Sequence, residues 1–132
     1  AMGSAELIEG LERIKNSFNS YPLGHVQLAA GVASFKDSDY FERTRQQVIN
    51  SREQLCQQLE ALGFEVLPSA ANFVFARHPD FNGGELTQSL RDRNIIVRHF
   101  DKPRISEFLR ITVGTEEQNQ LLVDSLKAIL EN

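Results

Sequence analysis

The stretch that decides the fold runs from Leu109 to Gln118 and reads Leu-Arg-Ile-Thr-Val-Gly-Thr-Glu-Glu-Gln. Apolar and polar residues alternate over its first five positions, which predicts a strand with one apolar and one polar face. Thr115 and Gln118 then have the spacing of a capping box, which marks the first turn of a helix. The apolar residues on one face of that helix are Leu122, Leu126, Ile129 and Leu130. The stretch therefore predicts a strand that leads directly into an amphipathic C-terminal helix.

Upstream of this stretch, short apolar runs alternate with turn residues. Gly63 and the segment 68–71 punctuate the chain, and Asn82-Gly83-Gly84 is interpreted as a plain turn. We expect strands at 64–67, 72–76 and 95–98, and a short helix at 85–93 with Leu86 and Leu90 facing inward. With the strand and helix already described, the order is ββαββα.

The longest predicted helix precedes these elements. Asp39 and Glu42 have the spacing of a capping box, and Gly63 offers the left-handed residue that commonly ends a helix. The residues that mark one face are Phe41, Val48, Leu55, Leu59 and Leu62. The helix should run for about six turns. A helix followed by ββαββα predicts an α+β fold with two layers, a small sheet covered by helices.

The first 35 residues form a separate region. Residues 6–18 have the apolar spacing of an amphipathic helix, and 19–24 are turn residues. Residues 25–35 are apolar and alanine-rich, and we expect a short helix packed on its neighbours. Residues 1–4, Ala-Met-Gly-Ser, resemble the scar of a cleaved expression tag and take no part in the fold.

Composition excludes several classes of protein. The chain has 132 residues, of which 41% are hydrophobic and 24% charged, and a formal net charge of −4. This balance is typical of a single globular domain and argues against a dedicated nucleic-acid binder. No apolar run approaches the roughly 20 residues that span a bilayer, and no signal peptide opens the chain. We expect a cytoplasmic domain with no nucleic-acid and no membrane partner.

Arg110 is the most informative residue for function. As the polar member of an alternating strand, it should point away from the core onto the open face of the sheet. A solvated surface arginine fits this position, and so does a guanidinium fork for a carboxylate or phosphate. Arg98, at the end of the 95–98 strand, also occupies a polar strand position, and the same two interpretations apply to it. His99 and Arg104 could add hydrogen-bond donors.

No metal site is expected. His25, His78 and His99 lie far apart in sequence and share no metal-ligand spacing with Cys56. Cys56, the single cysteine, follows Leu55 on the long helix and is interpreted as a buried core thiol.

Four segments together resemble histidinol-phosphate aminotransferases, which belong to the fold-type-I enzymes that depend on pyridoxal phosphate. They are Tyr21-Pro22-Leu23, Ser69-Ala70-Ala71-Asn72-Phe73, Asn94-Ile95-Ile96-Val97-Arg98, and Leu109 to Glu117. The resemblance implies the C-terminal small domain at 36–132, preceded by inter-domain connector helices at 5–35. It also implies transamination between histidinol phosphate and 2-oxoglutarate, with glutamate as the amino donor, in histidine biosynthesis.

The same resemblance implies roles for four residues. The arginine in the place of Arg110 grips the α-carboxylate of the amino donor, and the one in the place of Arg98 holds the phosphate or the distal carboxylate. Asn72 opens a strand near the mouth of the active site. Tyr21 lies in the connector and lines the cleft.

The resemblance also implies residues that this chain does not supply. The family's cofactor lysine follows a serine and precedes a glycine-rich stretch containing arginine. The lysines here, Lys15, Lys36, Lys102 and Lys127, lack that context. We therefore expect no catalytic or cofactor-binding residue in this chain, no stoichiometric pyridoxal phosphate and no activity in isolation. The large domain of the same enzyme, and a homodimer of the full-length enzyme, would be its partners.

Alternative interpretations of the function stay open. An aromatic-amino-acid aminotransferase or a phospho-amino-acid decarboxylase has the same fold. A stand-alone regulatory module that binds a small molecule could also show the ββαββα order.

Overall fold

The computed structural model describes residues 2–18 and 21–131, in the element order α1, α2, α3, β1, β2, α4, β3, β4, α5. The chain divides into two units, Ala1–Phe41 and Glu42–Asn132. The side chain of Phe18 is not described. Ala1 of the predicted tag scar and Asn19 and Ser20 of the predicted turn at 19–24 also lie outside the described residues. No helix in the described ranges is long and apolar enough to cross a bilayer.

The first unit contains α1 (Ala5–Phe18) and α2 (His25–Lys36), so both predicted helices are present. Leu7, Leu11 and Ile14 share a face of α1 and are exposed, Ile14 at 69%. The expectation that the second helix packs on its neighbours is wrong within the described chain, because none of its residues is buried.

The long helix α3 (Ser38–Ala61) is capped by a different residue from the one predicted. The Asp37 carboxylate accepts a hydrogen bond from the Tyr40 amide at 3.2 Å, as an N-cap does. Asp39 therefore lies inside the first turn, and Glu42 pairs with Arg45 at 2.7 Å instead of closing a capping box. Gly63 has φ of +89°, which confirms the left-handed residue after the helix.

The sheet of the second unit has four antiparallel strands in the order β1-β2-β4-β3. They are β1 (Glu65–Leu67), β2 (Phe73–Arg77), β3 (Arg98–His99) and β4 (Leu109–Thr112). β4 is central, so Arg110 faces Phe75 on one neighbour and Arg98 on the other. β4 alternates buried and exposed residues as predicted.

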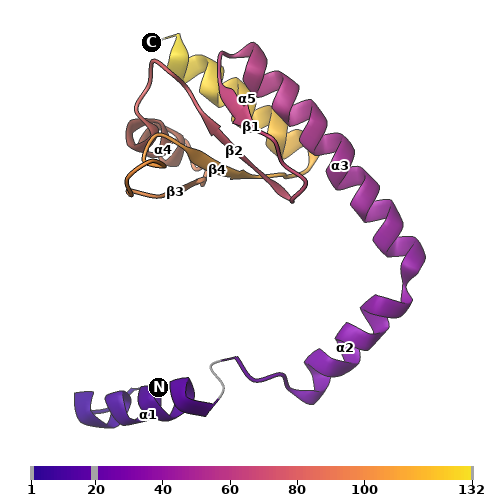
Figure 1. The fold of residues 1–132 in the computed structure, drawn as a ribbon, viewed down its shortest axis with the longest axis vertical. Coiled ribbons are helices and arrows are strands. Elements are labelled where there is room, and N and C mark those ends of the chain that lie inside the picture. Colours follow the sequence, from indigo (N-terminus) through magenta and orange to yellow (C-terminus); the bar gives the residue numbers. More distant parts are fainter. Residues whose placement is uncertain (1, 19–20, 132) are drawn as a thin grey trace. The chain divides into compact units, whose positions relative to one another are not determined.

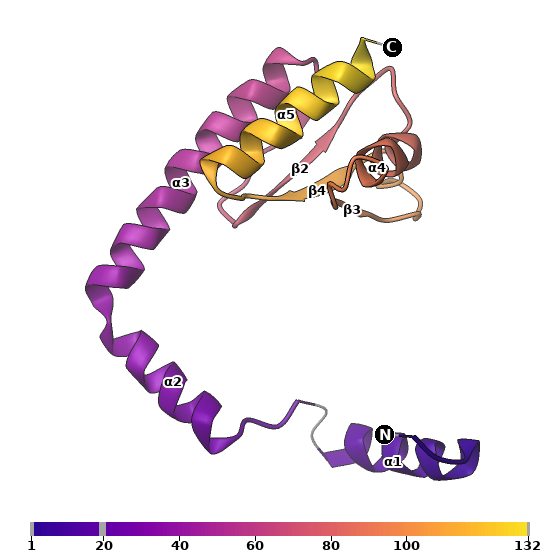
Figure 2. The same ribbon diagram turned by 180° about the vertical axis from the view of Figure 1, so that it is seen from behind.

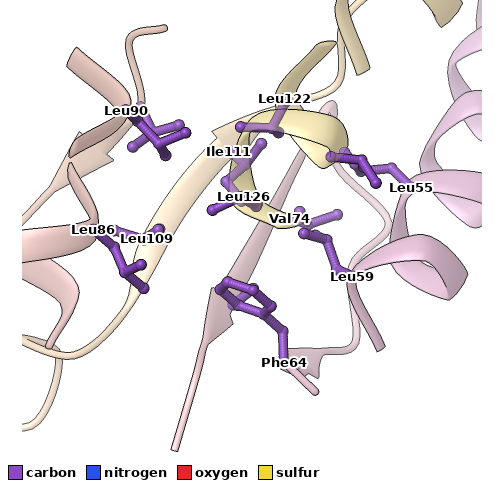
Figure 3. Packing of buried hydrophobic residues seen from close by; sticks show 13 residues of the cluster. Leu55, Leu59, Phe64, Val74, Leu86, Leu90, Leu109, Ile111, Leu122 and Leu126 are labelled. Carbon is purple, nitrogen blue, oxygen red and sulfur yellow. The ribbon is translucent and has the colours of Figure 1, made fainter. Parts of the chain in front are cut away.

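Three helices cover one face of this sheet, which confirms the predicted α+β layers. In Figures 1 and 2, α3 and α5 (Glu116–Leu130) run side by side, and Gln58 bonds Gln120 between them at 3.2 Å. Leu55 and Leu59 of α3 belong to the same core cluster as Leu126 of α5 (Figure 3). α4 (Gly83–Arg91) adds Leu86 and Leu90 to the same cluster, as predicted. The sheet residues beneath them are Val74, Ala76, Leu109 and Ile111.

The segment around α4 differs from the prediction at both ends. Asn82 is not part of a plain turn, because its side chain accepts from the amides of Gly84 and Glu85 and caps the helix. At the other end Asn94 has φ of +61°, and the Ile95 amide reaches back to the Leu90 carbonyl at 2.9 Å. This hydrogen bond closes the helix in a Schellman-like turn.

The strand predicted at 95–98 is consequently shorter. The backbone of Ile95 is engaged in the helix end, and regular pairing starts only at Arg98. At the C-terminal helix, by contrast, the predicted capping box is confirmed, with Thr115 and Gln118 making both reciprocal hydrogen bonds.

Candidate anion-binding site

Arg98 and Arg110, the two candidate anion ligands identified from the sequence, lie directly opposite each other on the open face of the sheet. Arg98 of β3 and Arg110 of β4 are partners in the antiparallel register, and both side chains are exposed. Their neighbours in the strands turn to the opposite face, where Leu109 and Ile111 are buried. The alternation of the strands therefore brings together the two guanidinium groups that the sequence singled out.

Neither arginine forms an ion pair with a carboxylate of residues 2–18 or 21–131. Other arginines of the second unit do form ion pairs, among them Arg45 with Glu42 and Arg77 with Glu65. Like charges directly opposite on neighbouring strands are unfavourable unless an opposite charge joins them. Two guanidinium groups that lie opposite each other and have no carboxylate partner among the described residues can each offer two parallel N–H donors to a carboxylate or phosphate.

A hollow of about 540 Å³ adjoins these arginines, beside α4. Its lining residues are Gly84, Thr87, Gln88, Arg91, Ile96, Val97, Arg98, His99, Arg110 and Thr112. Three of these are arginines and none is acidic, although the whole chain carries a net charge of −4. Positive charge is thus concentrated at this hollow, which favours an anionic small molecule.

Sequence reasoning missed the contribution of α4 to the hollow. Thr87, Gln88 and Arg91 come from this helix and line the same space as the strand arginines. Their spacing of three and four residues places them on one helical face opposite to the inward leucines. This row of polar residues could have indicated the contribution of α4 from the sequence. It brings Arg91 to the hollow as a third arginine.

Aromatic rings border both strand arginines. The Arg98 Cζ atom lies 5.3 Å from the centroid of the Phe100 ring, and the Arg110 Cζ atom lies 5.8 Å from the same ring. Arg110 also lies 5.4 Å from the Phe73 ring. These distances are within the range of cation–π contacts, which hold guanidinium groups in place.

The loop between the two arginine strands is attached to the start of α4. The Glu107 carboxylate accepts from the Gly83 amide at 3.2 Å, near the positive end of the helix dipole. His99 donates from Nε2 to the Ser106 carbonyl at 2.6 Å. A Cβ atom on Gly83 would lie 2.8 Å from the Ser106 carbonyl oxygen, so this close approach requires glycine. His99 thus lines the hollow and anchors the loop.

The remaining predicted residues lie elsewhere. Asn72 immediately precedes β2, where its carbonyl accepts from the Val113 amide at 2.9 Å, and it does not line the hollow. Arg104, with φ of +74°, is exposed and does not line it either. Tyr21 lies in the first unit, where the Lys15 amine is 5.8 Å from its ring centroid.

Cys56 is less buried than predicted. It is half-buried and packs against the core from α3, and burial is the main cause of the raised pKa of its thiol. A raised pKa disfavours the thiolate, which agrees with a structural thiol. Within residues 2–18 and 21–131, no group of three or more His, Cys, Asp or Glu residues could hold a metal ion.

Comparison with known proteins gives consistent matches. The family model of class I and II aminotransferases matches residues 1–126. Histidinol-phosphate aminotransferase 1 of Pseudomonas aeruginosa is 60% identical over 126 residues, which are 96% of this chain and 36% of that protein. The chain therefore spans little more than a third of such relatives.

Solved structures match as well. The crystal structure of histidinol-phosphate aminotransferase from Clostridium acetobutylicum superposes with a TM-score of 0.78 at 25% identity, covering 92% of this chain and 37% of that one. The enzyme of the same name from Sinorhizobium meliloti, solved with pyridoxal-5'-phosphate, gives a TM-score of 0.76 at 22% identity, covering 92% of this chain and 34% of that one. The second likeness concerns the fold alone.

Proposed function

The chain belongs to the class I and II aminotransferase family, and we propose that it forms the substrate-binding small domain of a histidinol-phosphate aminotransferase. The observation that carries this proposal is the opposed pair Arg98 and Arg110 beside a hollow lined by no carboxylate. The full-length enzyme would transfer the amino group between histidinol phosphate and 2-oxoglutarate in histidine biosynthesis, in the cytoplasm. In the direction of histidine biosynthesis, glutamate would donate the amino group that histidinol phosphate receives, and 2-oxoglutarate would be the oxo acid left behind.

The arginine pair suits this pair of substrates. Glutamate carries an α-carboxylate and a distal carboxylate, and histidinol phosphate carries a distal phosphate. We assign the α-carboxylate to Arg110 and the distal anion to Arg98. A guanidinium presents two parallel N–H donors, so each arginine can hold one such group in a fixed orientation. Binding by two forks would orient glutamate and exclude water from both of its carboxylates, whereas histidinol phosphate would use the fork of Arg98 for its phosphate.

The family depends on pyridoxal phosphate, which supplies an aldehyde and an electron sink when bound. The residues of this chain do not fit that group, because its binding needs a lysine amine at the site. Lys15, Lys36, Lys102 and Lys127 are all exposed, and none lines the hollow. The chemistry of the cofactor would therefore come from the large domain, and this chain would bind and orient the substrate.

Other parts of the chain receive roles within this proposal. Residues 5–35 would connect the two domains, and residues 36–132 would form the small domain. The exposed apolar face of α1 agrees with a helix that is covered in the full-length enzyme. Tyr21 would line the cleft and Asn72 its mouth. The full-length enzyme would act as a homodimer.

The experiment compares the full-length enzyme and its Arg98→Ala variant with histidinol phosphate and with histidinol. Truncation leaves a desolvated phosphate under-paired, whereas histidinol never uses that contact. We expect kcat/KM to fall on the order of 30-fold or more for the phosphorylated substrate and far less for histidinol. The matched control is Arg93→Ala, which removes an exposed arginine that does not line the hollow. Equal losses for both substrates would contradict phosphate recognition by Arg98 and favour an aromatic-amino-acid aminotransferase.

A further inference from the structure

Phe100 occupies a position between the two proposed anion-binding arginines. It directly follows β3 and begins the loop that leads to β4. The side chain is half-buried, and its ring lies 5.3 Å from the Arg98 Cζ atom and 5.8 Å from the Arg110 Cζ atom. The same ring therefore contacts the guanidinium groups of both arginines, which are partners in the strand register.

A ring in this position offsets an electrostatic cost. Two guanidinium groups on directly opposed residues repel each other, and without restraint their long side chains would turn apart into water. The negative faces of an aromatic ring attract both groups. Holding the forks near each other before the ligand arrives reduces the ordering cost of binding.

The ring and an anion use different surfaces of a guanidinium. Aromatic rings contact its flat face, whereas carboxylates and phosphates bind its N–H edge. An arginine can therefore keep its ring contact while it binds an anion. Phe100 thus supports binding rather than competing with it.

We propose that Phe100 is a positioning residue of the anion site, which holds Arg98 and Arg110 ready for a carboxylate- or phosphate-bearing ligand. This inference rests on the proposed function. The contacts make it asymmetric, because Arg110 has a second ring, Phe73 at 5.4 Å, and no second ring contact is found for Arg98 among the described residues. Loss of Phe100 should therefore release Arg98 more than Arg110.

The sheet offers a matched control. The Phe108 ring lies 5.6 Å from the Arg77 Cζ atom, a contact of the same kind. Arg77 is paired with Glu65 at 2.7 Å, and neither Phe108 nor Arg77 lines the hollow. Phe108→Leu thus removes a ring beside an arginine that does not line the hollow. The Phe108 ring also stacks on Phe75, with centroids 4.7 Å apart, but it contacts neither Arg98 nor Arg110 as a cation–π partner.

The test uses the full 132-residue chain, labelled with ¹⁵N, with inorganic phosphate as the probe. Side-chain Nε–Hε resonances report the mobility of each arginine and its response to phosphate. In Phe100→Leu we expect Arg98 to become more mobile and the phosphate Kd to rise roughly 3- to 10-fold, the size of one or two exposed cation–π contacts. Phe100→Tyr should restore both readouts, because its ring keeps the negative face. Phe108→Leu should change neither.

The outcomes separate this inference from the proposed function. Unchanged Arg98 mobility and phosphate affinity in Phe100→Leu would overturn the role of Phe100. If that variant unfolds, Phe100→Met keeps a long apolar side chain and gives the same comparison. Absence of phosphate shifts at Arg98 and Arg110 in the wild-type chain would refute the anion site, and with it the positioning role of Phe100. Phosphate shifts that Phe100→Leu leaves unchanged would refute the role of Phe100 alone.

Discussion

The two faces of the sheet are built by the same strands and have opposite chemistry. Beneath the helices, Val74, Ala76, Leu109 and Ile111 are at most 2% exposed. Their neighbours along the strands, Phe73, Phe75, Arg110 and Thr112, lie on the open face, where the arginines and aromatic rings gather. In β2 and β4, alternate residues therefore build the apolar core and the open face that carries charged and aromatic side chains.

This difference shows how a small domain can present a rigid site. The buried residues that hold β4 in place, Leu109 and Ile111, are one peptide bond away from Arg110, which we propose binds the ligand. Substitutions at neighbouring positions should therefore have separable effects, on unfolding for one face and on binding for the other.

The largest effect is expected for Leu109→Ala on the covered face. Leu109 is fully buried, so truncation removes apolar contacts and leaves a cavity that costs about 2–5 kcal/mol of unfolding free energy. Urea unfolding of the 132-residue chain measures this loss. The neighbouring Arg110→Ala should change stability by no more than about 0.5 kcal/mol. A similar loss in both variants would contradict the division between the faces.

The converse experiment replaces Arg110 in the full-length enzyme. Removing a charge-assisted fork from a desolvated carboxylate costs about 2–5 kcal/mol, a loss of roughly 30- to several-thousand-fold in kcat/KM for glutamate. Arg110→Lys should recover little, since a point charge cannot reproduce two parallel hydrogen bonds. Steady-state kinetics measure the loss, with Arg93→Ala as control. Turnover within about twofold of wild type would make Arg110 a solvated surface residue.

The smallest effect is expected where the open face carries an ordinary ion pair. The Arg77 and Glu65 side chains are 41% and 54% exposed, so water screens their attraction. A double-mutant cycle with Arg77→Ala and Glu65→Ala should give a coupling free energy of about 0.2–1 kcal/mol, decreasing with added salt. Coupling well above this range would show that the open face also contributes strongly to stability.

The sequence predicted most clearly those features that depend on local periodicity. Alternation at Leu109–Thr112 and the Thr115–Gln118 capping box each involve residues close in the chain, and both predictions were correct. The position of Arg98 opposite Arg110 depends on strand pairing. The alternation of polar and apolar residues predicted that Arg98 and Arg110 lie on the open face of the sheet. It could not predict that the two residues are direct partners in the pairing of β3 with β4.

The predicted ends of helices and strands were wrong where a short polar side chain or a left-handed residue decides the backbone conformation. Asp37 takes the cap that Asp39 was expected to supply, because both carry the same side chain near the helix start. Asn94 adopts a left-handed conformation that ends α4 and delays β3, which the apolar run 95–97 concealed. The need for glycine at position 83 comes from a loop more than 20 residues away, so no local pattern reveals it.

The opposition of Arg98 and Arg110 has a consequence for thermal stability. A ligand that binds the folded chain and not the unfolded chain raises the unfolding free energy, by about 1.4 kcal/mol at ten times its Kd. Relief of the repulsion between the two guanidinium groups is part of that binding free energy, because the unfolded chain does not experience this repulsion. The melting temperature of the domain should therefore report occupancy of the hollow. At equal ionic strength, phosphate should raise the melting temperature of the wild-type chain more than that of Arg98→Ala, because the general stabilisation by phosphate acts on both chains and occupancy of the hollow on one.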